Sequence, residues 1–212
     1  NNAAVDHFRI RVHGKSTHVS TPHLGVDALY IASQIVVAVQ GLVTRRTSPT
    51  EPVIIGIGKL NAGTTYNAVA AFAEMEGTTR TISQESRDRV RAQVSETAQS
   101  IAALYGGTAE IEWTDFAAAL VNDPQVCREA AEVVDELLGE GHVVTDRELS
   151  LSGDNFAEFE LYKPGAYAYL GTGNPDLPHT MITNHNGGFD VDENALVTGA
   201  GLYVGYTVAR LG

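Results

Sequence analysis

The sequence contains a single cysteine, Cys127, so no disulfide can form within the chain. It also lacks a run of roughly 18 apolar residues, the length that a membrane-spanning helix needs. Its first residues, 1–4, carry neither the basic flank nor the apolar stretch of a signal peptide. A lone cysteine fits a reducing compartment. Together these absences predict a protein with no membrane segment and a cytoplasmic location.

Positive charge is also scarce. The 14 lysines and arginines stand against 26 aspartates and glutamates, which gives a formal net charge of −12. Proteins that bind nucleic acid need clustered basic side chains to contact the phosphates. The composition therefore argues against a nucleic-acid partner and predicts an acidic, solvated surface.

Hydrophobic periodicity predicts a regular order of elements in the first half of the chain. Alternating apolar residues indicate strands, and apolar residues three or four positions apart indicate helices. The predicted elements are a strand at 8–12, a helix at 26–43, strands at 53–60 and 67–81, a helix at 86–105 and a strand at 109–113. This β-α-β-β-α-β order predicts an α/β (α+β) domain with a four-stranded antiparallel sheet and two helices on one face.

The pattern changes after Thr114, and we place a domain boundary between residues 117 and 118. The second half is predicted to contain a helix at 123–138, a strand at 142–144, a helical turn at 156–161, a buried strand at 166–170, a polar loop at 171–188 and a helix at 192–210. Five apolar or small positions of the last helix are expected to face inward: Leu196, Gly199, Leu202, Val204 and Val208. A polar loop as long as the one predicted here is usually functional or disordered.

Three segments together resemble one known family. They are GKSTHVSTPH at 14–23 followed by Val26-Asp27, GTTYNAV at 63–69 followed by EGTTRT at 76–81, and HNGGFDVDE at 185–193. They resemble, in order, the G-K-G-G-H-x-x-x-P-H, G-G-x-x-x-N-V-I-P…G-T-x-R-T and H-x-x-x-F-D-x-D-E elements of the M20 metallopeptidase/amidohydrolase family. The resemblance covers nearly the whole chain and is strongest for the branch that cleaves N-acyl amino acids.

The resemblance implies a homodimeric hydrolase with two divalent metal ions, which could be Zn, Mn, Co or Ni. It implies that residues 1–117 form the dimerisation (lid) domain and that residues 118–212 form the C-terminal portion of an α/β zinc-peptidase-like catalytic domain, whose N-terminal part is absent. Most metal ligands of the family lie in that absent part. We therefore expect the chain by itself to be inactive.

Two histidines are candidate site residues through this resemblance. His18, in a loop of small residues, matches a histidine that stabilises the tetrahedral oxyanion from the other subunit of the dimer. His185 matches a metal ligand, although one ligand cannot make a site, because zinc-like sites use at least three protein donors. Without the motif, each would be an ordinary exposed loop histidine. His179 is a weaker candidate ligand, and a structural hydrogen bond at His23 is at least as plausible as a direct role.

Asn67 and Arg80 are candidate substrate-binding residues. A guanidinium can hold a carboxylate through two hydrogen bonds, and an amide can donate beside it, so the pair would select acylated amino acids. The alternatives are turn chemistry for Asn67 and a surface ion pair for Arg80. The chain departs from the family at Ala70, where a proline is usual, and at 154–155, where Asp-Asn replaces Glu-Asp.

Two functions therefore remain open. In the first, the parent enzyme hydrolyses the amide bond of N-acyl amino acids or small peptides, and this chain supplies dimerisation, oxyanion and carboxylate-binding groups. In the second, the chain is a non-catalytic module that self-associates or binds carboxylate ligands. An amidase assay distinguishes them.

Overall fold

The computed structural model describes residues 1–212 and contains two compact units. The first unit consists of Asn1–Val121 and Leu149–Phe159, and the second of Asn122–Glu148 and Glu160–Gly212. The chain thus leaves the first unit after Val121 and returns to it once. The boundary placed at 117/118 lies near the first crossing, but a single boundary does not describe the returning segment. The assignment of the two parts to a lid and a catalytic domain stays a prediction.

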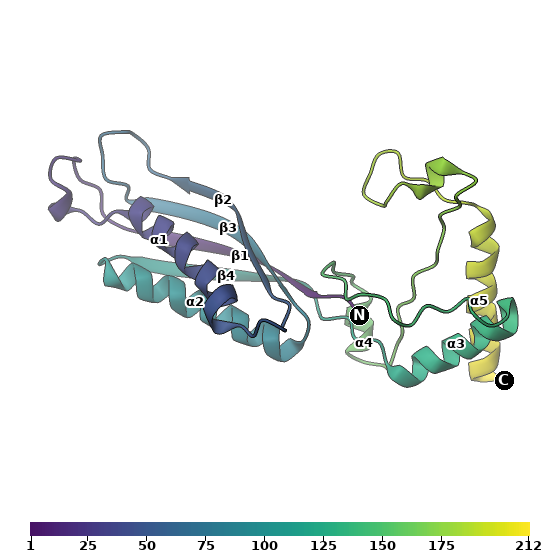
Figure 1. Ribbon diagram of the computed structural model, residues 1–212. Coiled ribbons are helices and arrows are strands. Elements are labelled where there is room, and N and C mark those ends of the chain that lie inside the picture. The colour runs from purple at the N-terminus through teal and green to yellow at the C-terminus, as the bar shows by residue number, and fades with distance from the viewer. The chain divides into compact units, whose positions relative to one another are not determined.

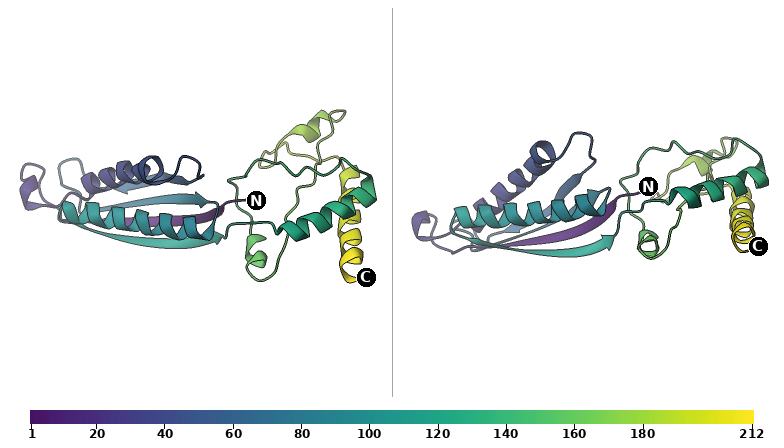
Figure 2. Two further views of the ribbon diagram at one scale, coloured as in Figure 1. Left: turned by 60° about the horizontal axis from the view of Figure 1, so that its bottom comes forward. Right: turned by 90° about the horizontal axis from the view of Figure 1, so that it is seen from below.

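The first unit is built on a four-stranded antiparallel sheet with strand order β2-β3-β1-β4. Its strands are β1 (Ala4–His13), β2 (Ile54–Ala62), β3 (Phe72–Thr81) and β4 (Thr108–Ala117). Two helices, α1 (Ala28–Gly41) and α2 (Gln84–Leu104), cover one face of the sheet (Figures 1 and 2). The predicted element order, sheet and helix placement are confirmed.

The core of this unit lies between the sheet and the helices. Alternate residues of β1, beginning with Phe8, point inward and are fully buried. From α1 they meet Ile31, Ile35 and Val39, each 0% exposed. This inward stripe has the i, i+4, i+8 spacing of one helix face. The core therefore forms where alternate residues of the strand, with a period of 2, face the apolar stripe of the helix, with a period of 3.6 residues.

Residues Ala28–Arg46 form one helical run, α1 followed by a π-helical turn (Leu42–Arg46). By length and composition this run could cross a membrane. Its inward stripe packs on the sheet, as in the core helix of a folded domain. One such helix is weak evidence for a membrane span.

The other face of the sheet carries alternating charges. Four basic or titratable side chains follow one another on β1, and glutamates of β3 and β4 lie opposite them. Arg11 Nε lies 3.0 Å from Glu74 and its Nη2 3.1 Å from Glu112. His7 Nε2 lies 3.1 Å from Glu76. Positive charge on the central strand is thus compensated on both sides.

In the second unit, α3 (Pro124–Leu138) packs against α5 (Asn194–Leu211). Small residues of α5 allow this approach, since a Cβ at Gly205 would lie 2.8 Å from Val133 Cγ1. Glu129 of α3 accepts hydrogen bonds from the Tyr206 hydroxyl (3.2 Å) and from Arg210 Nη1 (2.9 Å). The remaining short helices are α4 (Ala157–Glu160) and the 3-10 turns Pro22–Leu24 and Pro178–Met181.

Of the five positions predicted to face inward on the last helix, Gly199 and Leu202 are partly buried, but the other three are exposed in this chain. No residue of α5 is buried, and Leu196, Val204 and Val208 are 61%, 64% and 66% exposed. The helix is apolar on nearly all sides, so the sequence did not show which side would meet α3. The side with Gly201 and Gly205 does so, because only small residues let the helices come close.

The strands predicted at 142–144 and 166–170 are also absent, and both segments are irregular. A strand exists only where a neighbour satisfies its backbone groups, and neither segment has a neighbouring strand in this chain. The third difference is smaller. β3 begins at Phe72 rather than at 67, because the intervening residues bond to the loop that follows β1.

Candidate functional site

Two loops meet at one end of the first unit and bring two of the predicted residues together. The loop after β1 and the connection between β2 and β3 exchange backbone hydrogen bonds, from Val19 N to Asn67 O (3.1 Å) and from Val69 N to Thr17 O (2.8 Å). His18 forms a β-bridge with Ala68. We call this end, residues 14–27 and 61–71, the tip. His18 and Asn67 therefore share one rigid backbone frame, although they are 49 positions apart in sequence.

The exposed imidazole of His18 has a defined orientation. Its Nδ1 lies 3.2 Å from the backbone N–H of Ser20 and 2.7 Å from the Ser20 hydroxyl. A backbone N–H can only donate, so Nδ1 accepts and the proton of the neutral ring lies on Nε2. Nε2–H is then left as a donor without a partner in the chain. The neighbouring Ser20, which the sequence motif did not single out, fixes this tautomer.

Asn67 is half-buried, and a neighbouring hydroxyl orients its amide. Thr65 Oγ1 donates to Asn67 Oδ1 over 3.2 Å. This contact leaves the Nδ2 group of Asn67 as the donor available to a ligand. The tip thus presents two donors, the imidazole Nε2–H and the amide Nδ2–H, and each is set by a hydroxyl two residues away in sequence.

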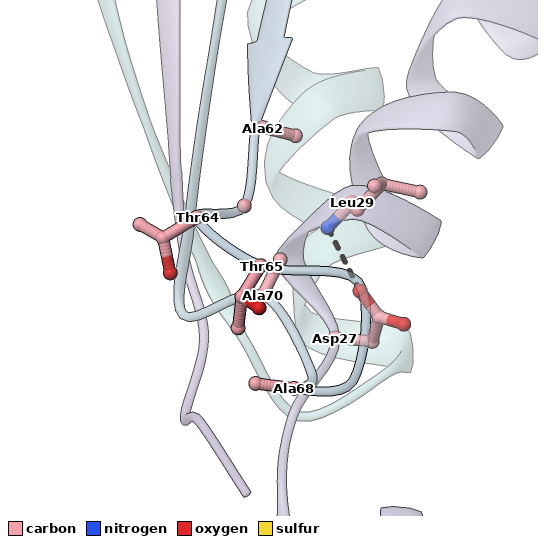
Figure 3. A pocket seen from close by; sticks show the side chains of 8 residues that line it. Asp27, Leu29, Ala62, Thr64, Thr65, Ala68 and Ala70 are labelled. Carbon is pink, nitrogen blue, oxygen red and sulfur yellow. Dashed lines mark hydrogen bonds between the residues drawn. The ribbon is translucent and has the colours of Figure 1, made fainter. Parts of the chain in front are cut away.

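A cavity of about 370 Å³ lies between the start of α1 and the connection of β2 to β3 (Figure 3). Apart from Leu29, its lining consists of small and polar residues: Asp27, Ala62, Gly63, Thr64, Thr65, Ala68 and Ala70. Asp27 caps α1 by accepting from Leu29 N (3.0 Å) and Tyr30 N (3.1 Å). Ala28 N bonds to Ala70 O (2.9 Å), so the first amides of the helix are already satisfied. The start of α1 is therefore not an anion site.

Arg80 lies at the opposite end of β3 from the tip. It is paired across the sheet with Val5 of β1 and Ile54 of β2. Eight positions of strand separate it from Phe72, which corresponds to roughly 26 Å. Its guanidinium makes no hydrogen bond or ion pair within the chain. The structure therefore does not bring Arg80 beside Asn67 in one chain.

The returning segment 149–159 packs at this same end of the sheet. Ala3 N bonds to Ser150 O and Ser152 O, each at 3.1 Å, and Glu158 accepts from Ala118 N at 2.9 Å. The Asp-Asn departure at 154–155 has a structural role here, because Asp154 accepts from Phe156 N (2.8 Å) just before α4. Its carboxylate is thus turned toward its own backbone.

In the second unit, His185 lies in the loop before α5. It is exposed, and its φ of 61° makes it the one non-glycine residue in the left-handed region. Asp192 closes the loop by accepting from Asn174 Nδ2 at 2.7 Å, and these bonds lower the pKa of Asp192. His179 lies 3.8 Å from Asp190. Left-handed backbone at a non-glycine residue is common at functional sites.

The chain has no group of three or more His, Cys, Asp and Glu side chains placed to hold a metal ion. His185 belongs to no such group, and Cys127 is a half-buried residue of α3. The residues present therefore do not make a metal centre by themselves.

The chain is similar to known proteins over most of its length. Residues 4–105 match the peptidase dimerisation domain family. The chain is 34% identical over 199 residues to thermostable carboxypeptidase 1 of Saccharolobus solfataricus, covering 93% of this chain and 49% of that protein. It is 31% identical over 195 residues to N-acetyl-L-cysteine deacetylase of Bacillus subtilis, covering 92% and 45%.

A solved structure is similar over the same length. The YxeP protein of Bacillus subtilis, described as a dinuclear metal binding peptidase of the M20 family, superposes with a TM-score of 0.78 at 27% identity, covering 99% of this chain and 51% of that one. The chain spans about half the length of the curated relatives it matches.

Proposed function

From the premise that the chain belongs to the M20 metallopeptidase/amidohydrolase family, we propose that it serves a hydrolase that cleaves the amide bond of N-acyl amino acids or small peptides. In this proposal, residues 1–117 are the dimerisation domain and residues 118–212 are the C-terminal portion of the catalytic domain. The observation that carries the proposal is the exposed His18 ring, whose Nδ1 accepts from Ser20 and whose Nε2–H is left to donate.

A histidine donor at an exposed tip suits stabilisation of a developing oxyanion. Charge appears on the carbonyl oxygen only as the amide is attacked, so a preorganised donor acts mainly on the transition state. Ser20 holds the ring in the required tautomer before substrate arrives. His18 thereby polarises the scissile carbonyl, and Asn67 Nδ2 donates to the substrate carboxylate beside it.

The relatives make divalent metal ions part of this proposal, since one is described as a dinuclear metal binding peptidase. Within this chain, His185 is the proposed ligand. In this proposal the other ligands come from outside residues 1–212, because no group of three or more His, Cys, Asp and Glu side chains in the chain is placed to hold a metal ion. For that reason we expect the isolated chain to bind divalent metal weakly and to be inactive.

The second unit supports the assignment to a larger catalytic domain. An apolar face of α5, with Leu196, Tyr203 and Val204, is exposed on the side away from α3. A helix that is apolar all round is normally buried. The strand-like segments at 142–144 and 166–170 likewise have no neighbouring strand. Both features fit a half-domain that is completed by more of the same polypeptide.

The proposed homodimer has a favourable edge in the first unit. The outer strand β4 carries charged residues such as Glu110 and Glu112, which disfavour pairing with a strand of another chain. The other outer strand, β2, is mostly uncharged, and α1 beside it exposes Val37 at 70%. Unguarded edges pair readily with another strand. We therefore place the contact between two copies at β2 and α1.

The separation of Arg80 from Asn67 gives the dimer a chemical role. A small substrate cannot span the roughly 26 Å between the two ends of one β3 strand. In the proposed site, Arg80 of one subunit and the tip of the other bind the same substrate. A cytoplasmic location remains a prediction.

The experiment compares the full-length enzyme with its Arg80→Ala variant on N-acyl amino acids and on their amidated analogues. Arg80→Ala should weaken transition-state binding of the free-carboxylate substrates by roughly 2–3 kcal/mol, because a charge-assisted contact is lost. The amidated analogues should change little. Arg91→Ala, which removes an arginine already paired with Asp115 at 2.7 Å, is the matched control. An unchanged preference for the free carboxylate would contradict the assignment of Arg80, and no amidase activity in the wild type would favour the non-catalytic module.

A further inference from the structure

Tyr66 is the most exposed large apolar side chain in the protein, at 96%. A single exposed apolar residue needs no explanation by itself. The position of Tyr66 does need one, because it directly precedes Asn67 at the tip. The Tyr66 ring contacts no other aromatic residue and no cation within the chain.

The backbone around Tyr66 is fixed while its ring is free. Asn67 O accepts from Val19 N (3.1 Å), and Gly63 N donates to Phe72 O (3.3 Å), which closes the connection between β2 and β3. Gly63 has a φ of 71°, a conformation that glycine adopts without strain. The ring therefore extends from a defined point into solvent. A rigid aromatic side chain offers a large contact area at a low cost in conformational entropy.

The residues on either side of Tyr66 in sequence favour a small ligand over a protein surface. Residues 61–68 contain no other large apolar side chain, and the nearest neighbours in sequence are Thr64, Thr65, Asn67 and Ala68. Protein interfaces have an apolar core made of several adjacent residues. Small-molecule sites instead combine an aromatic contact with a few oriented polar groups. Tyr66 beside the Asn67 amide has the second composition.

We propose that Tyr66 is a specificity-determining residue that contacts the side chain of the substrate's amino acid and favours apolar side chains. This inference rests on the proposed function, in which Asn67 donates to the substrate carboxylate. The amino-acid side chain and the carboxylate branch from the same carbon atom. A carboxylate held at Asn67 therefore brings the side chain within reach of the neighbouring ring.

The test uses the full-length enzyme and four substrates with one acyl group: N-acetylglycine, N-acetylalanine, N-acetylleucine and N-acetylphenylalanine. Tyr66→Ser should lower kcat/KM for the leucine and phenylalanine substrates about tenfold and leave the glycine substrate within about twofold. Tyr66→Phe should retain the preference of the wild type. Tyr105→Ser is the control, because Tyr105 ends α2 and its ring lies against Tyr30.

The outcomes separate this inference from the proposed function. An equal change on all four substrates, or no change on any, would overturn the role of Tyr66 and leave the proposed function standing. A wild-type enzyme without activity on any of the four would refute the proposed function and this inference with it. Mass spectrometry of the native dimer and circular dichroism confirm that each variant is folded and assembled.

Discussion

At the scale of single residues, the strongest electrostatic feature is the buried ion pair of Asp6 and Arg87. Asp6 is 1% exposed and Arg87 7%, with Nη2 lying 2.7 Å from Oδ1. The hydrogen bonds to Asp6 raise the pKa of Arg87, so the arginine stays charged. Asp6→Ala should lower the free energy of unfolding by about 3–5 kcal/mol, because a buried charge loses its partner. Urea unfolding measures this.

Asp115→Ala is the matched control for that measurement. Asp115 also contacts Arg87 and Arg91, but its side chain is 66% exposed. Its loss should change the free energy of unfolding by less than about 1 kcal/mol. Equal effects of the two variants would show that burial of the Asp6 pair does not govern stability.

Glu76, on the charged face of the sheet, predicts a pH dependence. Hydrogen bonds from Lys59 and His7 lower its pKa from 4.5 to about 2. A carboxylate whose pKa is lowered by folding stabilises the folded state above its unfolded value, and this contribution is lost as the pH falls from 4.5 toward about 2. Glu76→Gln should therefore reduce stability at neutral pH and flatten the acid limb of the unfolding profile. Glu110→Gln, at a side chain 72% exposed, should leave that limb unchanged.

The candidate site residues differ in how far the sequence could predict them. The residue types at 18, 67, 80 and 185 could be selected from the sequence through the family motifs. The pairing of His18 with Asn67 could not, because it depends on bonds between two loops. The distance between Arg80 and Asn67 could be estimated from the sequence, because consecutive residues of an extended strand are about 3.3 Å apart. The hydroxyls of Ser20 and Thr65 carried no signal beyond their proximity in sequence.

At the scale of elements, Gly77 of β3 lies between β1 and β2, which pair with β3 on either side. An added Cβ there would collide with the Phe8 ring and with the backbone oxygen of Gly56. Gly77→Ala should therefore lower the free energy of unfolding by about 1–3 kcal/mol through overpacking. Gly58→Ala in β2 is the control, because an added Cβ meets nothing within 4 Å. Thermal unfolding of the two variants tests the difference, and a smaller loss for Gly77→Ala than for Gly58→Ala would contradict it.

Elements of the first half could be predicted because each one finds its partners within the same half of the chain. The sheet strands pair with one another, and the apolar stripes of α1 and α2 meet the sheet. The elements at 142–144 and 166–170 failed for the opposite reason, since neither has a neighbouring strand. An apolar pattern predicts that a segment tends to be buried. Whether the segment forms a strand depends on a neighbouring strand with which it can pair.

At the scale of the whole molecule, the two units have different degrees of completeness. The first has a closed core with many residues at 0% exposure, while α5 of the second has no buried residue. The chain also spans about half the length of its curated relatives. This contrast supports the proposal that catalysis belongs to the full-length protein and not to this chain alone.

The central claim is that His18 of one subunit completes the site of its partner, and mixed dimers test it most directly. In the full-length enzyme, His18→Ala should lower kcat by about 10²–10³-fold with little change in KM, the scale of one lost oxyanion donor. His185→Ala should be nearly inactive through loss of a proposed metal ligand. A dimer with one subunit of each kind has one site with an intact His185 and the partner's intact His18.

Mixing the two inactive variants and allowing the subunits to exchange should therefore restore about a quarter of wild-type activity, since half of the dimers are mixed and each has one complete site. Native mass spectrometry confirms that mixed dimers have formed. No recovery of activity in their presence would contradict the claim, because it would mean that His18 serves the site of its own subunit or no site at all.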